Sequence, residues 1–195
     1  MAGSLWVSFT ANNDTNSLLV CSSSGGVNWT DNTNTGREIL TSSLAVFNNR
    51  LYLAFTPGEL KEMPIWLCSS PDGLNWTAPD CFTGQFGFNQ SLAVFNNRLY
   101  IAFIGNNDAN PVQVCSSPSP DDAKSWTGGT PINQSSQSAP SLAVFNNRLY
   151  VAFIANNQTN SVLVCSSSDG VNWTDNTNIN QSGNSTPYLA EGSLR

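Results

Sequence analysis

Short runs of amide and carboxylate side chains recur along the chain at a nearly constant spacing. The runs are Asn12, Asn13 and Asp14; Asn106, Asn107 and Asp108; and Asn156, Asn157 and Gln158. Amides donate and accept hydrogen bonds and carboxylates accept them, so these groups suit the vicinal hydroxyls of a sugar. The alternative for each residue is that Asn or Asp only stabilises a turn. We predict that the runs bind ligand, and we expect residues 56–62, which depart from the pattern, to form an altered or lost pocket.

Aromatic residues form a second group of candidates. Phe86 and Phe88 stand close to Phe82 in a cluster without a counterpart elsewhere in the chain. Exposed apolar clusters often mark contact surfaces, so Phe86 and Phe88 are also predicted to bind ligand. Four tryptophans recur at one position of a repeat and are expected to pack in the core instead of stacking on sugar. They are Trp29, Trp76, Trp126 and Trp173.

The residue types argue against catalysis. The chain has no histidine, which excludes Ser-His and Cys-His nucleophile pairs and histidine metal sites. Hydrolysis by acid and base needs two placed carboxyl groups, and no pair stands out among the thirteen acidic residues. Arg50, Arg98 and Arg148 are repeated and are expected to be structural, binding turn carbonyls or a neighbouring repeat. We therefore expect no enzyme, no catalytic residue, no metal and no cofactor.

These candidates sit within an internal repeat. The decapeptide SLAVFNNRLY begins without change at residues 43, 91 and 141, so the repeats are offset by 48 and 50 residues. A period in this range is typical of the four-stranded blades of a β-propeller. Single Cys residues recur at one place in each repeat, too far apart to bridge, and are expected to be buried. They are Cys21, Cys68, Cys115 and Cys165, whereas Cys81 is unmatched and could be a free or paired thiol.

The last full repeat predicts four strands. Residues 141–147 alternate and end at Asn146 and Asn147, a pair that suits a tight hairpin turn. Residues 149–154 form the expected second strand, 162–166 the third and 171–179 the fourth, with Trp173 on its apolar face. A loop over 155–161 joins the second and third strands. No segment has sustained helical periodicity, so such sheets must cover one another's faces around an axis.

The predicted fold is all-β: a four-bladed β-propeller with four antiparallel strands per blade. Residues 4–9 match the second strand of a repeat, and residues 188–190 match the start of the first. Pairing of these N- and C-terminal strands would close the ring. We expect one domain over 1–195, with blades at 4–35 plus 187–195, 43–83, 91–133 and 141–180.

The repeat resembles that of bacterial sialidase-like and lectin-like β-propellers. The resemblance is carried by residues 141–153 and by SSSDGVNWT at 166–174. Residues 70–76 (SPDGLNW) are similar to the Asp box of sialidases, with one residue fewer between Asp and Gly. In that family the Asp box is a folding element away from the active site, which implies that Asp72 and Asp169 form turns. Propeller lectins with near-identical blades imply a pocket on each blade.

The charge composition limits the classes of partner that the chain is expected to bind. Only 10% of the residues are charged and the formal net charge is −6, so nucleic acid and insertion into membranes are not expected. Residues 1–10 lack the features of a signal peptide, and the cysteines leave the compartment open. We predict a lectin that binds glycans or glycoconjugates through several similar weak sites, as a monomer or small homo-oligomer. The alternative is a non-catalytic scaffold or protein-interaction propeller.

Overall fold

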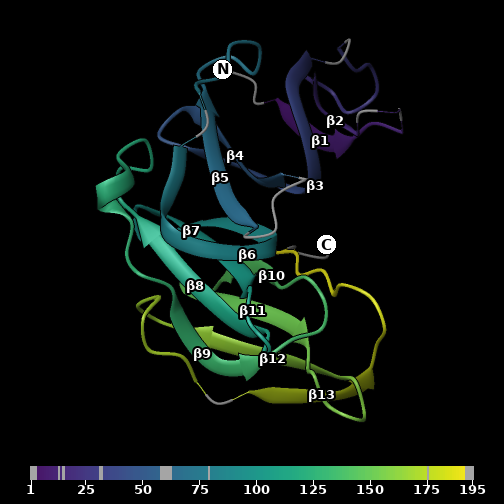
Figure 1. The fold of residues 1–195 in the computed structure, drawn as a ribbon, viewed down its shortest axis with the longest axis vertical. Helices are drawn as coiled ribbons and strands as arrows, with labels where there is room; N and C mark the ends of the chain where they lie inside the picture. Colours follow the sequence, from purple (N-terminus) through teal and green to yellow (C-terminus); the bar gives the residue numbers. More distant parts are fainter. Residues whose placement is uncertain are drawn as a thin grey trace.

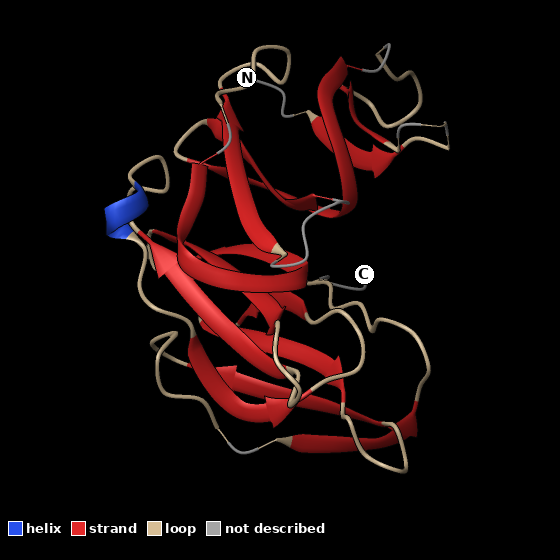
Figure 2. Cartoon of the chain, in the orientation of Figure 1, coloured by secondary structure: helices blue, strands red, loops and turns tan. Residues whose placement is uncertain are grey.

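The computed structural model describes residues 4–12, 14, 16–30, 33–57, 63–78, 80–174 and 176–191, without the side chains of residues 80–84. Almost all regular structure in this part is antiparallel strand, and the short 3₁₀ helix η1 (Ala123–Ser125) is the one helical element among these residues (Figure 2). The strands are β1 (Leu5–Thr10), β2 (Ser17–Ser23), β3 (Thr33–Phe47), β4 (Arg50–Pro57), β5 (Pro64–Ser70), β6 (Asp80–Phe95), β7 (Arg98–Gly105), β8 (Pro111–Ser117), β9 (Thr130–Ser135), β10 (Ser141–Phe145), β11 (Arg148–Ile154), β12 (Ser161–Ser167) and β13 (Thr177–Ser182). The all-β prediction is confirmed.

The strands pair with their sequence neighbours to form successive meanders, which we call blades. Strands β1 to β9 form one sheet in sequence order, and β10 to β13 form a second. The long strands β3 and β6 each end one blade and begin the next, because their two halves pair with different neighbours. Blade 1 thus holds β1, β2 and the start of β3, and blades 2, 3 and 4 begin with the end of β3, the end of β6 and β10. Figure 1 shows the blades following one another along a curved path, with β1 and β2 at one end and β13 at the other.

Closure of the ring by the two ends is not confirmed. In the described part of the chain, β1 pairs with β2 alone, and residues 187–191 belong to no strand. These C-terminal residues lie along blade 4 instead, where the Leu189 N–H donates to Ser141 Oγ at 2.9 Å.

That hydrogen bond belongs to a repeated series, which we call the serine latch. The Leu92 N–H donates to Ser43 Oγ at 3.0 Å, and the Leu142 N–H donates to Ser91 Oγ at 2.9 Å. Each serine begins the first strand of one blade, and each leucine lies in the first strand of the next blade. The Leu189 bond gives the C-terminal segment the place of a further first strand. Polar backbone groups near a core need such partners, so the latch fixes the register of neighbouring blades.

The hairpin turns form as the sequence predicts. Both residues of each Asn-Asn pair have positive φ, between 46° and 59°, which a two-residue turn of the primed type requires. The predicted fourth strand is wrong in its start, because β13 begins at Thr177 and Trp173 lies in the preceding turn. Asp169 causes this difference. Its Oδ1 accepts the N–H groups of Val171 and Asn172, both at 2.8 Å, and so curls the chain.

Apolar residues pack between adjacent blades. One buried cluster joins blades 3 and 4 around Tyr100, Phe153 and Leu163, and another joins blades 2 and 3 around Tyr52 and Phe103. Trp126 lies in the second cluster, while Trp76 and Trp173 pack against clusters from partly buried positions. Trp29 differs, since it is 46% exposed. Of the repeated cysteines, Cys68, Cys115 and Cys165 are buried and Cys21 is partly buried, and none of these four takes part in a disulfide; Cys81 lies outside the described side chains.

Aromatic side chains also connect each blade with the next. They contact the turn between the third and fourth strands of the next blade, which we call its outer turn. A Cβ added to Gly73 would lie 2.1 Å from the Trp6 ring, and one added to Gly170 would lie 2.2 Å from the Tyr100 hydroxyl. Each aromatic residue is on one blade and each glycine on the next. The Tyr52 hydroxyl makes the equivalent contact by donating to Asp121 Oδ2 at 3.0 Å. Burial, reinforced by this hydrogen bond, raises the pKa of Tyr52 to about 12.

A left-handed residue precedes the third strand of every blade. Its carbonyl accepts an N–H from the connection to the next blade, as in Met63 O with Gly87 N at 2.8 Å. The equivalent residues are Asn16, Asn110 and Asn160, and φ at all four positions lies between 45° and 49°. Asparagine tolerates this conformation better than an unbranched apolar residue does. Met63 is therefore strained where its counterparts are not.

We expect Met63→Asn to raise the free energy of unfolding by about 1 kcal/mol, because the substitution relieves a left-handed non-glycine residue. The melting temperature should rise by roughly 2–4 °C. Asn110→Met is the matched control and should lower stability by a similar amount. Equal unfolding midpoints for the wild type and Met63→Asn, measured in urea, would contradict the strain at Met63.

Candidate functional site

The loops between the second and third strands carry the predicted ligand-binding residues. Asn106, Asn107 and Asp108 follow β7, Asn156, Asn157 and Gln158 follow β11, and all six side chains are exposed. Asn12 and Asp14 follow β1 and are also exposed, while Asn13 lies outside the described residues. These loops lie beside the connections that join consecutive blades. The Asn106 N–H donates to Phe86 O at 3.0 Å, and the Asn156 N–H donates to Ser135 O at 3.1 Å.

The two amides within each pair have different roles. Asn157 Oδ1 accepts the Thr159 N–H at 3.1 Å and the Thr159 hydroxyl at 3.0 Å. Asn107 Oδ1 accepts the Ala109 N–H at 3.0 Å in the same way. The turn role that sequence analysis offered as the alternative thus holds for the oxygen atoms of Asn107 and Asn157. Asn156 instead faces solvent next to the preceding blade.

A polar hollow of about 380 Å³ lies between blades 3 and 4 and contains two of the predicted residues. We call it the amide hollow. Its lining combines the end of blade 3 with the loop and last strand of blade 4: Asn133, Gln134, Ser135, Ala155, Asn156, Asn157, Ser161, Leu163, Asn176 and Asn178. All of these side chains are uncharged, and most are amides or hydroxyls that can both donate and accept hydrogen bonds. The volume falls within the range of small-molecule pockets.

A second hollow of about 410 Å³ lies where the first strands of the blades begin. No residue of this hollow was among the predicted ligand-binding residues. Equivalent residues of the blades line it together with the C-terminal segment: Thr41, Ser42, Ser43, Asn89, Gln90, Ser91, Ala139, Pro140, Ser141, Thr186 and Tyr188. The latch serines are part of this lining, and the Thr41 hydroxyl donates to Gln90 Oε1 at 3.0 Å. The invariant serine that opens each decapeptide was the signal that could have located this hollow.

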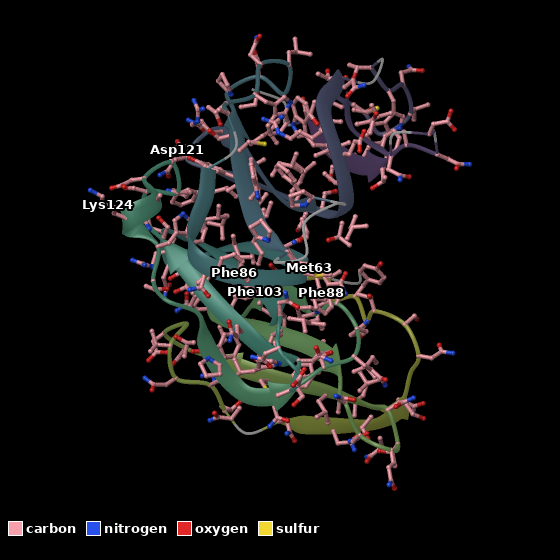
Figure 3. The ribbon with its side chains drawn as sticks, viewed as in Figure 1. Met63, Phe86, Phe88, Phe103, Asp121 and Lys124 are labelled. Atoms are coloured by element: carbon pink, nitrogen blue, oxygen red, sulfur yellow. The ribbon has the colours of Figure 1, made fainter. Side chains whose placement is uncertain are left out.

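The structure places Phe86 next to Asn106, two predicted ligand-binding residues that belong to different groups in the sequence. Phe86 stands beside Asn106 because their backbones are hydrogen-bonded, and its side chain is 41% exposed. Phe88 is half-buried and pairs with Ile104 on β7. Figure 3 shows Phe86 and Phe88 near Met63 and Phe103, far from Asp121 and Lys124 in the outer turn. Phe82 is outside the described side chains.

The repeated charged residues serve the scaffold. Arg50 and Arg148 donate to the hydroxyls of Ser69 and Ser166 on the third strands of their own blades, and Arg98 does the same to Ser116. Asp72 and Asp169 hold turns, as the sequence predicts, and hydrogen bonds from Asn75 and Asn172 respectively are the main reason that their pKa values lie well below the usual range. Among the described residues, no three His, Cys, Asp or Glu side chains gather as a metal site. No helix in the same part of the chain is long and apolar enough to span a membrane.

The sequence of residues 70–184 matches the family described as the DUF6242 beta propeller domain. The match covers more than half of the chain, from the end of β5 in blade 2 through blades 3 and 4. This chain belongs to the DUF6242 β-propeller family. The prediction of a propeller is thereby confirmed, whereas a specific relation to sialidase-like Asp-box repeats stays a prediction. No curated protein sequence matches this DUF6242 propeller.

Several solved structures with a similar fold are glycoside hydrolases. An exo-β-1,3-galactanase from Clostridium thermocellum aligns with a TM-score of 0.64 and 12% identity over 92% of this chain and 46% of its own. A GH43_1 enzyme from Xanthomonas citri, solved with xylose, aligns with a TM-score of 0.64 and 11% identity over 88% and 68%. A family 117 glycoside hydrolase from Zobellia galactanivorans gives 0.61 and 14% over 81% and 54%. The DUF6242 propeller spans only 43% of the length of a galactanase from Phanerochaete chrysosporium.

These neighbours correct the expectation that the chain is not an enzyme. That expectation rested on the lack of histidine and of an obvious carboxylate pair. The near-identity of the repeats also favoured it, because a catalytic site needs unlike groups at one place. Enzymes that hydrolyse glycosides share this propeller fold, so a repeated framework is no argument against catalysis. A single blade can carry side chains that its neighbours lack while the backbone repeats.

The different roles of the paired asparagines give a test of loop stability. Asn157→Ala removes an acceptor of three hydrogen bonds, from the N–H and hydroxyl of Thr159 and the N–H of Ser161, and should lower the free energy of unfolding by about 1 kcal/mol. Asn156→Ala leaves those bonds in place and should change it by less than about 0.5 kcal/mol. Urea denaturation measures both, with Asn157→Asp as a control that keeps the acceptor oxygen. Equal effects of the two alanine variants would contradict the division of roles.

Proposed function

We propose that this DUF6242 propeller binds neutral carbohydrate between neighbouring blades, with the amide hollow as the principal site. The observation that carries the proposal is the lining of that hollow, in which exposed Asn156 and Asn176 face an uncharged, polar space. Amide groups can serve as donor and acceptor to adjacent sugar hydroxyls at once. The uncharged lining favours neutral sugars over uronic or sialic acids, since an anion would lose its hydration without gaining a cationic partner.

The glycoside hydrolases that share the fold give independent support. Their names identify them as enzymes that act on carbohydrates, and propellers of this kind therefore suit the recognition of sugar chains. Repetition of the loops on several blades would add avidity, because linked weak sites bind a surface dense in glycans far more tightly than one site does. Similar blades therefore support a lectin role through avidity.

A glycan array followed by titration calorimetry with the best neutral oligosaccharide tests the proposal. The double variant Asn156→Ala, Asn176→Ala should weaken binding by at least about tenfold, because two hydrogen-bonding groups are lost from a site that depends on them. Asn28→Ala removes an exposed amide from the opposite, outer turn of blade 1 and should bind as the wild type does. Thermal unfolding should be unchanged in both.

Two results would overturn the proposal: an array without any bound neutral glycan at high protein concentration, or a double variant with wild-type affinity. Release of reducing sugar, followed in the same samples, would identify a hydrolase acting on the bound glycan.

We further propose that the two ends complete one blade and close a four-bladed ring. The Leu189 latch bond supports this proposal. The contact between an aromatic side chain of one blade and the outer turn of the next gives further support, because blade 4 has an equivalent aromatic residue and blade 1 has an equivalent glycine. Tyr150 is equivalent to Trp6, Tyr52 and Tyr100, and with Phe145 and Leu189 it lines a hollow of about 170 Å³. Gly26 has a φ of 77°, close to the values of Gly73 and Gly170. In a closed ring the Tyr150 side chain would pack against Gly26, as Trp6 packs against Gly73 and Tyr100 against Gly170.

Deletion of residues 187–195 should lower the melting temperature sharply or cause aggregation, because it removes a latch bond and uncovers the last blade. Differential scanning calorimetry and light scattering measure the two effects. A melting temperature equal to that of the full chain would show that the ends do not close the ring in this way.

A further inference from the structure

The surface between blades 2 and 3 repeats the backbone of the amide hollow with different side chains. The Asn106 N–H to Phe86 O bond is equivalent to the Asn156 N–H to Ser135 O bond. Phe86 therefore occupies the place of Ser135. The bonds from Gly87 N to Met63 O and from Ser136 N to Asn110 O confirm this alignment one residue later.

The side chains around Phe86 combine an aromatic face with amides. A Cβ added to Gly129 would lie 2.4 Å from Gln85 Oε1 and 2.7 Å from Gln113 Oε1, so both glutamines converge at this glycine. Strand pairing makes Gly129 the counterpart of Asn176, and Gln113 the counterpart of Leu163. We call Gln85, Phe86, Asn106, Gln113 and Gly129 the Phe86 surface.

The backbone under Phe86 is held firmly. A Cβ on the adjacent Gly87 would lie 2.3 Å from the Ile104 carbonyl oxygen, so β6 and β7 approach too closely there for a larger residue. Phe86 itself is 41% exposed although its neighbour Gly87 is buried. A half-exposed ring on a closely packed backbone beside amide groups is suited to stacking against the C–H face of a sugar while the amides bind its hydroxyls.

We propose that the Phe86 surface is a second carbohydrate site that takes pyranosides with an unbroken C–H face, and that residues 86 and 135 determine which sugar each site accepts. This inference rests on the proposed function of the amide hollow. The hollow, with Ser135 at the same place, recognises its ligand through hydrogen bonds. The two sites are thus alike in backbone and unlike in selectivity.

Exchange of the two residues tests the proposal by NMR titration and calorimetry. Cellobiose is the probe, because all its ring hydroxyls are equatorial and leave C–H faces free, and methyl α-mannopyranoside, with an axial hydroxyl, is the comparison. Phe86→Ser should weaken cellobiose binding by about tenfold, whereas Phe86→Tyr should keep it, as expected for loss and retention of a stacked ring. Ser135→Phe should gain a second cellobiose site. Methyl α-mannopyranoside should respond less to each change.

Phe86→Ser and Ser135→Phe are expected to fold because each introduces the residue that the equivalent position of the other blade already carries, and Phe86→Tyr keeps the aromatic ring. Cellobiose affinity unchanged by Phe86→Ser, in a protein whose neutral glycan binding is lost on changing Asn156 and Asn176, would overturn this inference and leave the amide hollow standing. Absence of binding by every neutral sugar would overturn both.

Discussion

The hydrogen bond between a serine hydroxyl and the leucine N–H of the next blade organises this propeller. Both partners are positions of the repeated decapeptide, so the middle copy supplies the donor to one neighbour through Leu92 and the acceptor to the other through Ser91. A backbone N–H at the crowded start of a strand needs a partner, and a serine is short enough to provide one without separating the strands. The apolar clusters between blades and the aromatic contacts with the outer turns then follow from the register that this bond sets.

The blades share one backbone conformation but carry different side chains on their surfaces. The connection to the next blade places Glu38, Phe86, Ser135 and Ser182 at equivalent positions, each before a residue that donates to a left-handed carbonyl. An acid, an aromatic ring and two hydroxyls therefore occupy similar surroundings. The glycoside hydrolases with this fold show how such a framework supports carbohydrate chemistry, and the loop and connection residues are where individual blades can differ without disturbing the core.

Much of the framework could be predicted from the sequence because its signals are local. The Asn146–Asn147 turn, the adjoining strands and the Asp169 turn depend on residues close in sequence, and the period of the decapeptide indicates the blades. The start of β13 was missed because the carboxylate of Asp169 holds Val171 and Asn172 in a turn that their β-propensity opposes. The hollows were harder to predict, since they need residues such as Gln134 and Asn156 from different blades. The proximity of Phe86 and Asn106 depends likewise on the packing of blades and not on any pattern within one repeat.

The identity of the three decapeptides has a consequence for how the chain reaches its native state. A hairpin formed from residues 91–100 meets the same partner surfaces as one formed from 43–52 or 141–150, so the latch cannot distinguish the correct neighbour from one displaced by a whole blade. Repeat proteins with this degeneracy are prone to misassembly and to exchange of units between chains. The order of the blades must then come from the unlike elements, namely the outer turn with η1, the Phe86 connection and the two ends. The residues that differ between blades thereby specify which blades pair during folding, in addition to forming the surface of the native protein.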